Sequence, residues 1–523
     1  RSKCYTRGRY YYSYYNNYRL PPVGRCVNVG GNMNYSMIRY ILAWVFTFEG
    51  MFLMLPAIVG GIYGEKQGLV YLAIAAGCLL VGTLSRIRKI RSKVFYSKEG
   101  FAAVSLSWII MSLVGALPFF ITGEIPAYED ALFETISGFT TTGSSILSNV
   151  EALTHCSLFW RSFTHWIGGM GVLVFIMAVL PLSGGSIMHL MRAESPGPAV
   201  GKLVPKIRHT AMILYGIYIV FTLVEIIALL ITGMSPFEAM TLTFGTVGTG
   251  GFGVLNDSIA SYSLASQIVI TTFMIICSIN FNVYYLLLIR KTKEAFMNQE
   301  LRYYLGIVFG SALLIAINIK GSFDNFFMAF HTALFQVASV SSTTGFATTD
   351  FNLWPEFSKT ILVLLMFVGA CAGSTGGGIK VSRLVVFLKA IKSEVMSITH
   401  PRSVQKVQTD GRPLSNDAVR RVLCYLGAYV IIVLVSILLI SLDGKDMTTN
   451  LTAVMATFNN IGPGLNLVGP TSNFGDYSVF SKIVLMFDML VGRLEIFPLL
   501  ILFAPGLWTV PKRRLAKKKK NFE

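Results

Sequence analysis

The chain has 523 residues, of which 53% are hydrophobic and only 13% are charged, and its mean hydropathy is +0.61. A soluble domain carries about 25% charged residues, so this composition excludes an ordinary cytosolic enzyme and a disordered protein and leaves a membrane protein with many spans. The net charge of +18 does not indicate a nucleic-acid partner, because the basic residues lie in short runs between apolar segments.

The first 32 residues are rich in Tyr, Asn and Arg and show no apolar period, so we expect a disordered or non-native extension there. Ten apolar segments of spanning length follow. They run over about 38–63, 67–84, 101–122, 158–182, 210–232, 264–289, 303–319, 358–388, 420–442 and 479–508. This pattern predicts an all-α polytopic membrane protein with ten transmembrane helices.

The loops between these segments alternate in charge. RIRKIRSKVFYSK after the second segment, the long stretch 389–421 and the tail PKRRLAKKKK are basic, whereas the intervening loops are mostly acidic. Basic loops stay on the cytoplasmic side, so both termini are predicted to be cytoplasmic. The seven cysteines are odd in number and lack CxxC spacing, which indicates neither a metal site nor a disulfide framework.

Four loops on the acidic side repeat one motif. They read ALFETISGFTTTGSS (131–145), AMTLTFGTVGTGGFG (239–253), ALFQVASVSSTTGFA (333–347) and AVMATFNNIGPGLN (453–466). Each keeps a ten-residue step to a glycine, from Phe133 to Gly143, Thr241 to Gly251, Phe335 to Gly345 and Val454 to Gly464. Recurrence at about 100-residue intervals means internal repetition. Each repeat unit consists of a membrane span, a re-entrant half-helix, a glycine loop and a second membrane span.

Lipid cannot satisfy free backbone N–H and C=O groups, so such loops must face protein or a water-filled cavity. Four loops that converge on a pseudo-fourfold axis would direct carbonyls inward and replace the hydration shell of a monovalent cation. Glycine allows the necessary backbone torsions, and the half-helices turn their partially negative C-terminal ends toward the ion. The repeat therefore predicts a potassium site built from main-chain oxygens.

At these residues the sequence resembles the Trk/Ktr/HKT superfamily of potassium transporters, most closely its TrkH/TrkG branch. The resemblance is carried by the four loop motifs together with HWIGGMGVLVF (165–175), AGSTGGGIKVSR (372–383) and MLVGRLEIFP (489–498). It implies four M1–P–M2 repeats around a pore in each protomer of a homodimer. It also implies a bacterial inner-membrane location and regulation by a cytosolic TrkA-like nucleotide-binding ring; no nucleotide motif of that kind occurs in this chain.

On this basis the chain divides into seven parts. They are an extension (1–32), two N-terminal transmembrane helices (33–98), repeat 1 (99–190), repeat 2 (191–297), repeat 3 with a broken second helix (298–395), repeat 4 (396–510) and a basic cytoplasmic tail (511–523).

The resemblance assigns the potassium filter carbonyls to four groups of residues: Thr141, Thr142 and Gly143; Thr249, Gly250 and Gly251; Thr343, Thr344 and Gly345; and Gly462, Pro463 and Gly464. In the fourth loop either Gly462 or Gly464 fits the key position. In the second, Gly248 of TVGTG is an alternative to Gly251, but it breaks the ten-residue step. Glu134 on the first half-helix is expected to add negative field at the mouth, and His165 to be a packing residue.

The second helix of the third repeat contains Gly373, Ser374, Thr375, Gly376, Gly377 and Gly378, followed by Lys380. Each glycine costs about 1 kcal/mol relative to alanine in a helix, so the helix should break there. In the family this segment is a loop that obstructs the pore and acts as a gate. Close helix packing through small residues is the alternative.

Arg493 lies inside the last span, where an arginine costs roughly 2.5–3.5 kcal/mol unless it faces protein or water. The family places this arginine in the pore beneath the filter, and we expect it to hold the gate closed by binding its carbonyls. The alternative is a structural pair with Asp488 or Glu495.

The predicted function is potassium uptake through a gated pore, with potassium as the transported ion and no enzymatic activity. Two other functions were weighed: a KdpA-like subunit of an ATP-driven potassium pump, and a membrane-embedded enzyme. The order of motifs disfavours the first. The six scattered histidines, which form no HExxH-like cluster, disfavour the second.

Overall fold

The computed structural model describes residues 33–88, 97–171, 207–402 and 405–505, and this part of the chain is mostly helical. Two short strands, β1 (Gln408–Thr409) and β2 (Arg412–Pro413), pair antiparallel. The predictions for residues 1–32 and 511–523, and for the junction of repeats 1 and 2, lie outside the described residues.

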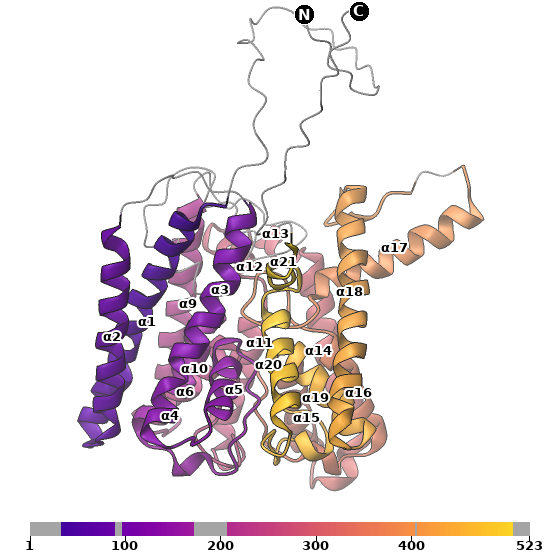
Figure 1. Ribbon diagram of the computed structural model, residues 1–523. Helices are drawn as coiled ribbons and strands as arrows, with labels where there is room; N and C mark the ends of the chain where they lie inside the picture. The colour runs from indigo at the N-terminus through magenta and orange to yellow at the C-terminus, as the bar shows by residue number, and fades with distance from the viewer. Residues whose placement is uncertain (1–32, 89–96, 172–206, 403–404, 506–523) are drawn as a thin grey trace, which may run out of the picture.

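Two long helices, α1 (Tyr35–Tyr63) and α2 (Gln67–Ile87), pack together at one edge of the bundle (Figure 1). Glycines allow their close approach: a Cβ on Gly60 would collide with the backbone of Gly68. Contact through small residues is a common way for helices to associate in a bilayer, where the hydrophobic effect supplies no force between them. The pair corresponds to the predicted spans 38–63 and 67–84.

The rest of the described chain forms four units of similar design. Each has a long helix, then a short helix and a loop, then a second helix. The long helices are α3 (Ser97–Gly115) continued by α4 (Leu117–Thr122), α9 (Ile207–Ile231), α14 (Gln299–Ile319) and α18 (Asn416–Ile440). The short helices are α5 (Tyr128–Phe139), α10 (Pro236–Gly248), α15 (Phe326–Ser341) and α19 (Met447–Phe458). The second helices are α6 (His155–Met170), α11 (Leu264–Cys277), α16 (Glu356–Phe367) and α20 (Val479–Arg493).

The second helices are interrupted more often than the sequence predicted. The predicted span 358–388 is not one helix, because α16 ends at Phe367 and α17 (Val381–Thr399) starts after a non-helical segment. Only this break was expected. However, α11 also turns by 90° into α12 (Phe281–Leu288), and a turn separates α20 from α21 (Phe497–Leu502).

Six described helices are long and apolar enough to cross a membrane, and the bent pair α11–α12 raises the number to seven. The predicted total of ten also counted interrupted second helices and the span 158–182, which runs beyond the described residues, so ten stays a prediction. The remaining helical elements are α13 (Thr292–Phe296) and the 3₁₀ turns η1 (Val150–Ala152), η2 (Lys320–Ser322), η3 (Phe351–Leu353), η4 (Ser441–Asp443) and η5 (Asn466–Val468).

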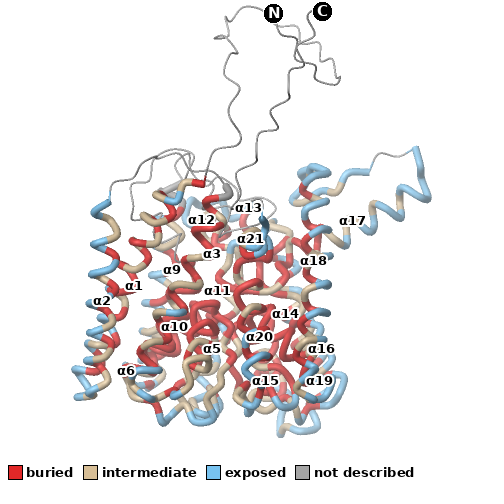
Figure 2. Tube along the Cα trace, in the orientation of Figure 1, coloured by how far each residue is buried: buried red, intermediate tan, exposed pale blue. Residues whose placement is uncertain are grey.

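Burial is concentrated in the centre of the bundle, on the short helices and the loops that follow them (Figure 2). The outer helices α2, α9 and α18 expose large apolar side chains such as Leu69, Ile231 and Leu438. An extended apolar surface of this kind is typical of contact with a membrane. The short helices lie in the half of the bundle away from α13 and α17, and α17 projects outward beside α18 (Figure 1).

Glu65, in the turn between α1 and α2, caps the N-terminus of α6. Its carboxylate accepts from the backbone N–H of His155 at 2.8 Å and of Cys156 at 2.9 Å, and from His155 Nδ1 at 2.9 Å. Burial raises the pKa of Glu65, but the hydrogen bonds from Cys156 and His155 outweigh it and hold the pKa below its usual value. The charged form of Glu65 is therefore the one that fixes the α1–α2 pair to the first unit.

We expect Glu65→Gln to lower the free energy of unfolding at neutral pH by about 1 kcal/mol, the typical value of a helix N-cap. Because the folded-state pKa is depressed, this stability is present above the unfolded value of about 4.3 and is lost as the pH falls through the folded value. Thermal unfolding in detergent at several pH values measures it. If the difference in thermal stability between wild type and Glu65→Gln were the same above and below the pKa of Glu65, the role of Glu65 as a charged cap would be contradicted.

Candidate functional site

All four short helices end in the same hydrogen-bonded turn. In each, a backbone N–H donates to the carbonyl five residues earlier at 2.7–2.9 Å, from Thr142 to Ser137, Gly250 to Gly245, Thr344 to Ser339 and Ile461 to Ala456. The preceding N–H donates to the carbonyl three residues earlier at 3.0–3.2 Å. This pair of bonds is the Schellman motif, which satisfies carbonyls at a helix C-terminus. The four loops therefore share one backbone conformation although their sequences differ.

The residue at the centre of each turn is left-handed without being glycine. The φ angles are 56° at Thr141, 55° at Thr249, 60° at Thr343 and 55° at Asn460. A β-branched residue rarely adopts this region, and such strain costs about 1–3 kcal/mol. It persists where the surrounding structure enforces it, which is often at functional sites.

Two residues further on, every loop has a glycine with positive φ: Gly143 (80°), Gly251 (79°), Gly345 (87°) and Gly462 (106°). A Cβ on each of the first three would run into a carbonyl oxygen of the next loop, and a Cβ on Gly462 would lie in tight contact with one at 3.0 Å. The oxygen belongs to Gly250 for Gly143, to Thr344 for Gly251, to Ile461 for Gly345 and to Thr142 for Gly462. Because the fourth contact returns to the first loop, the four loops form a closed ring.

Two side-chain hydrogen bonds complete the junction between the fourth and first loops. Asn460 Nδ2 donates to Thr142 Oγ1 at 2.8 Å, and Ser144 Oγ donates to the Gly462 carbonyl at 2.9 Å. These contacts join residues that are 318 positions apart in the chain.

The ring brings main-chain oxygens together, because at each junction the carbonyl of one loop lies against the glycine of its neighbour. A ring of carbonyls can replace the hydration shell of a monovalent cation, and four helix C-termini add partial negative charge. Among the residues that the structure describes, no group of three or more His, Cys, Asp or Glu side chains could hold a metal ion. The oxygens at the four junctions of the ring are main-chain carbonyls.

The ring contains the predicted residues of the first three loops, 141–143, 249–251 and 343–345. In the fourth loop it contains Asn460, Ile461 and Gly462, so of the two alternatives Gly462 takes the place of the ring glycine, and not Gly464, which the ten-residue step reaches. Gly464 packs on Val468 and Thr452 of its own unit, and Pro463 lies next to Gly345.

In the second loop, Gly248 is the last residue of α10, and Gly251 takes the ring position.

The segment 368–380, between α16 and α17, lies against this ring and holds the predicted gate residues. The Gly377 N–H donates to Thr343 Oγ1 at 2.6 Å, and a Cβ on Gly376 would meet the Ser342 carbonyl. On its other side, Thr375 Oγ1 donates to the Cys277 carbonyl at 3.1 Å. The glycines do permit close packing, and here the partner is the ring itself.

Arg493 binds both the segment and the ring. Its Nη1 donates to the Thr375 carbonyl at 3.0 Å and to Thr141 Oγ1 at 3.2 Å, and its Nη2 donates to the carbonyls of Gly169, at 2.9 Å, and Gly168. Lys380 Nζ donates to the carbonyls of Gly377, at 3.3 Å, and Gly376.

Two cationic side chains thus bind carbonyls of the segment. The expected contact of Arg493 with these carbonyls is present.

Asp488 and Glu495, the alternative partners expected for Arg493, bind other residues. Glu495 forms an ion pair with Arg383 of α17, and Asp488 accepts from Ser436 Oγ at 2.7 Å. Arg493 instead uses its donors on main-chain oxygens and a threonine hydroxyl.

Glu300 is a residue of this site that the sequence analysis missed. One of its oxygens accepts from the Ala372 N–H, within the segment, at 2.7 Å and from the Ser382 N–H, in the first turn of α17, at 3.0 Å, so it links the segment to the start of α17. An acidic residue at the start of a predicted span is ordinary, and only the fold reveals that it faces the segment.

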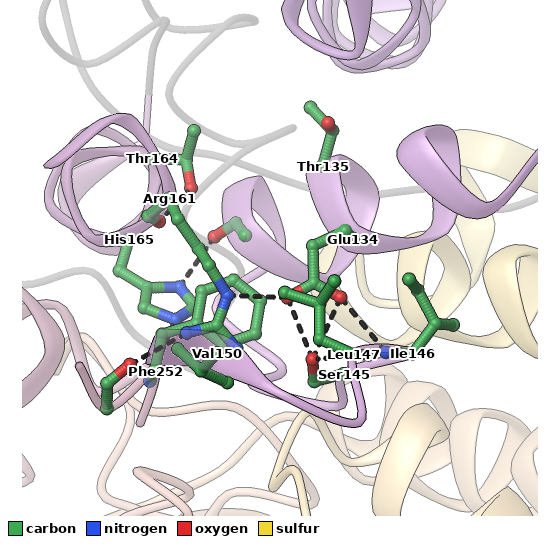
Figure 3. Close-up of polar contacts among 12 residues, drawn as sticks. Glu134, Thr135, Ser145, Ile146, Leu147, Val150, Arg161, Thr164, His165 and Phe252 are labelled. Atoms are coloured by element: carbon green, nitrogen blue, oxygen red, sulfur yellow. Dashed lines mark hydrogen bonds and ion pairs between the residues drawn. The ribbon is translucent and has the colours of Figure 1, made fainter. Parts of the chain in front are cut away.

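A buried ion pair lies beside the ring, between Glu134 of α5 and Arg161 of α6 (Figure 3). The Nε–Oε1 distance is 2.5 Å, and both side chains are buried. The expected negative field of Glu134 is therefore compensated by Arg161. His165, one turn further along α6, is buried and hydrogen-bonded, as expected of a packing residue.

A cavity of about 1450 Å³ extends from Arg493 and the segment 372–380 to α13 and the β1–β2 hairpin. Its wall includes Trp108, Gly169 and Glu300. Arg493 and the segment 368–380, which contact the ring, therefore also line this cavity, and the cavity reaches the side of the bundle that carries α13.

The chain matches the family model TrkH, described as a cation transport protein, over residues 70–319 and 326–509. It is 35% identical to the Trk system potassium uptake protein TrkH of Escherichia coli K12 over 484 residues, which covers 90% of this chain and 99% of the relative. It is 31% identical to TrkG of the same strain over 489 residues, covering 91% of this chain and 100% of the relative. The crystal structure of the potassium transporter TrkH from Vibrio parahaemolyticus has a TM-score of 0.82 at 32% identity and covers 91% of this chain and 100% of that chain.

We expect Thr343→Val to loosen the segment 368–380. The change keeps the β-branched shape but removes the acceptor of the Gly377 N–H, and an unsatisfied buried donor costs about 1–3 kcal/mol. Hydrogen–deuterium exchange of peptides covering 369–380 should become faster. The matched control is Thr249→Val, because the Thr249 hydroxyl donates to its neighbour Gly248 at 2.7 Å and should leave exchange in the segment unchanged. Equal exchange in both variants would contradict the contact.

Proposed function

The chain belongs to the TrkH family of cation transport proteins, a family of potassium uptake transporters in the membrane, and from this premise we propose that it conducts potassium through a pore whose selectivity filter is the ring of four loops. The observation that carries the proposal is the closed circle of contacts between each ring glycine and the carbonyl of the next loop. Potassium is the transported ion, and the chain carries out no chemical reaction.

The filter works by exchanging water oxygens for main-chain oxygens. Carbonyls of the residues 141–143, 249–251, 343–345 and 460–462 would surround a dehydrated potassium ion, as carbonyl rings do in potassium channels. The left-handed residues and the glycines set the direction of successive carbonyls. Because each loop rests on its neighbour, the ring resists the contraction that a smaller ion such as sodium would need.

In this proposal the segment 368–380 is the gate, and the gate is closed while the segment is bound to Thr343 and Arg493. Arg493 and Lys380 place positive charge beside the ring, which opposes the passage of a cation. Opening requires the segment to leave Thr343 and Arg493, and hence to break the hydrogen bonds Gly377–Thr343 and Arg493–Thr375. The neutral Gly377–Thr343 bond contributes about 0.5–1.5 kcal/mol and the charge-assisted Arg493–Thr375 bond about 1.5–3 kcal/mol, so a partner that binds the open form by a few kcal/mol more tightly would shift the equilibrium.

The end of the bundle that carries α13 and α17 faces the cytoplasm in this proposal. It bears Lys291, Lys293, Lys389 and Lys392, which agrees with the preference of basic loops for that side. Both termini are then cytoplasmic, and the membrane is the bacterial inner membrane.

The cavity opens toward this end. In this proposal a cytosolic TrkA-like regulatory subunit, which binds the nucleotide, docks on the homodimer at this end of the bundle. It controls the position of the segment 368–380.

Isotope flux into liposomes tests the filter. Gly143→Ser or Gly345→Ser would force a side chain into the carbonyl of the next loop, and we expect the ratio of potassium to sodium flux to fall about tenfold or more, equivalent to at least about 1.4 kcal/mol. Gly61→Ser is the control, because a Cβ there meets nothing within 4 Å. Wild-type discrimination in a correctly folded Gly143→Ser protein would overturn the assignment.

The gate is tested by Arg493→Ala. Removing charge-assisted hydrogen bonds worth about 1.5–3 kcal/mol should raise potassium flux about tenfold or more, by favouring the open segment. Rubidium and potassium uptake into liposomes, without any partner subunit, measures the change. Arg420→Ala, which removes an exposed arginine that pairs with Asp417 on the surface of α18, should leave flux unchanged. Equal flux in wild type and Arg493→Ala would exclude the barrier role.

A further inference from the structure

The first unit differs from the other three at two buried positions of its second helix. Counted from the N-caps Thr154, Ser263, Pro355 and Ser478, the seventh residue is Arg161, Ile270, Leu362 or Leu485, and the eleventh is His165, Met274, Met366 or Met489. All eight side chains are buried. Three units therefore fill these places with an aliphatic residue and a methionine, and the first unit fills them with an arginine and a histidine.

The short helices show the same contrast. Nine residues before the ring glycine stand Glu134, Leu242, Gln336 and Ala453, all buried. The first unit alone places a carboxylate there, and it faces the arginine of the same unit.

Arg161 connects the first loop to the second. Besides the ion pair with Glu134, its Nη1 donates to the Gly253 carbonyl at 2.8 Å, and its guanidinium carbon lies 3.6 Å from the centre of the Phe252 ring (Figure 3). Phe252 and Gly253 directly follow the ring glycine Gly251. A single side chain thus contacts α5 and the outer part of the second loop.

Glu134 extends this connection to the outer part of the first loop. Its carboxylate accepts from Ser145 Oγ at 3.0 Å and from the Ile146 N–H at 3.1 Å, just beyond the ring glycine Gly143. The pair Glu134–Arg161 therefore connects the residues that follow the first ring glycine, Gly143, to those that follow the second, Gly251.

His165 adds a second connection one turn further along α6. The Phe252 N–H donates to His165 Nε2 at 3.2 Å, so Nδ1 carries the proton and donates to the Gly138 carbonyl at 2.8 Å. A Cβ on Gly250 would collide with the imidazole ring. The imidazole of His165 therefore packs directly against Gly250 and limits where this residue can lie. The carbonyl of Gly250 is the one that contacts Gly143.

A buried ion pair is a costly way to fill a core position, and replacing one with apolar residues of similar size is often neutral or stabilising. The other three units use apolar residues at the position of Arg161. A buried side chain at these positions therefore need not be polar. Glu134, Arg161 and His165 make their polar contacts with α5 and with the first and second loops.

We propose that Glu134, Arg161 and His165 form a bracket that fixes the spacing of the first and second filter loops and thereby sets the ion discrimination of the ring. They are positioning residues, since they act through Gly250, Phe252 and Gly253 and not on the ion. The inference rests on the proposed function, because it takes the ring to be the filter.

The test replaces the bracket with residues that the third unit already carries, Glu134→Gln with Arg161→Leu. Changing both partners avoids an unpaired buried charge, so the double variant keeps a packed core. We expect total cation flux to stay within about threefold of wild type, while the potassium-to-sodium flux ratio falls about tenfold, as expected for a site displaced by a fraction of an ångström. If the pair were merely structural, the flux ratio would stay at the wild-type value, whatever the change in thermal stability.

His165→Met supplies a second, independent variant, because methionine is the residue of the other three units. It should also lower the ratio. Glu238→Gln is the matched control: it removes a carboxylate from another short helix, where Glu238 caps α10 through Ser235, and should not alter discrimination.

Potassium selectivity in the wild-type liposomes separates the two ideas. An unselective wild type would refute the proposed filter. A selective wild type with an equally selective, folded double variant and His165→Met would refute the bracket alone.

Discussion

The structure depends on helices that end inside the protein. A helix C-terminus leaves carbonyls without partners, and at membrane depth these must be satisfied by protein, water or an ion. Four short helices end together here, and each Schellman turn satisfies part of its carbonyls while leaving the next ones directed at neighbouring loops. Left-handed threonines and close-fitting glycines are consequences of that arrangement. The oxygens that remain are the chemical basis of the proposed pore.

The two sides of the ring are supported differently. On the cavity side, Arg493 and Lys380 bind carbonyls of the segment 368–380, and Glu300 links Ala372 of the segment to Ser382 at the start of α17. These contacts are made with main-chain atoms of a glycine-rich segment, so they can be exchanged for water when the segment moves. On the other side, the Glu134–Arg161 pair is enclosed and ties two loops to helices. The proposed gate and the Glu134–Arg161 pair thus contact different parts of the loops: the first contacts Thr343, and the second contacts residues just after the ring glycines.

Much of this site could be predicted from the sequence, because Thr141–Gly143 and Thr343–Gly345 recur at the same distance from a phenylalanine. The key glycine of the fourth loop stayed undecided between Gly462 and Gly464, since Asn460 replaces the threonine that marks the position in the other loops. The bend after Cys277 carried no glycine signal and was missed. Partners such as Glu300 and Arg383–Glu495 are set by tertiary contacts between distant units, which no local pattern encodes.

The junction between the fourth and first loops has a consequence for biogenesis. Asn460 binds Thr142, and Ser144 binds Gly462. The ring of loops therefore cannot close until the fourth loop, near residue 460, has been synthesised. Synthesis proceeds at about 5–20 residues per second, so the first three loops wait on the order of ten seconds or more for the last. Until then the contacts that the fourth loop makes with the first and third loops are missing, and buried main-chain oxygens there need water or another protein as a partner.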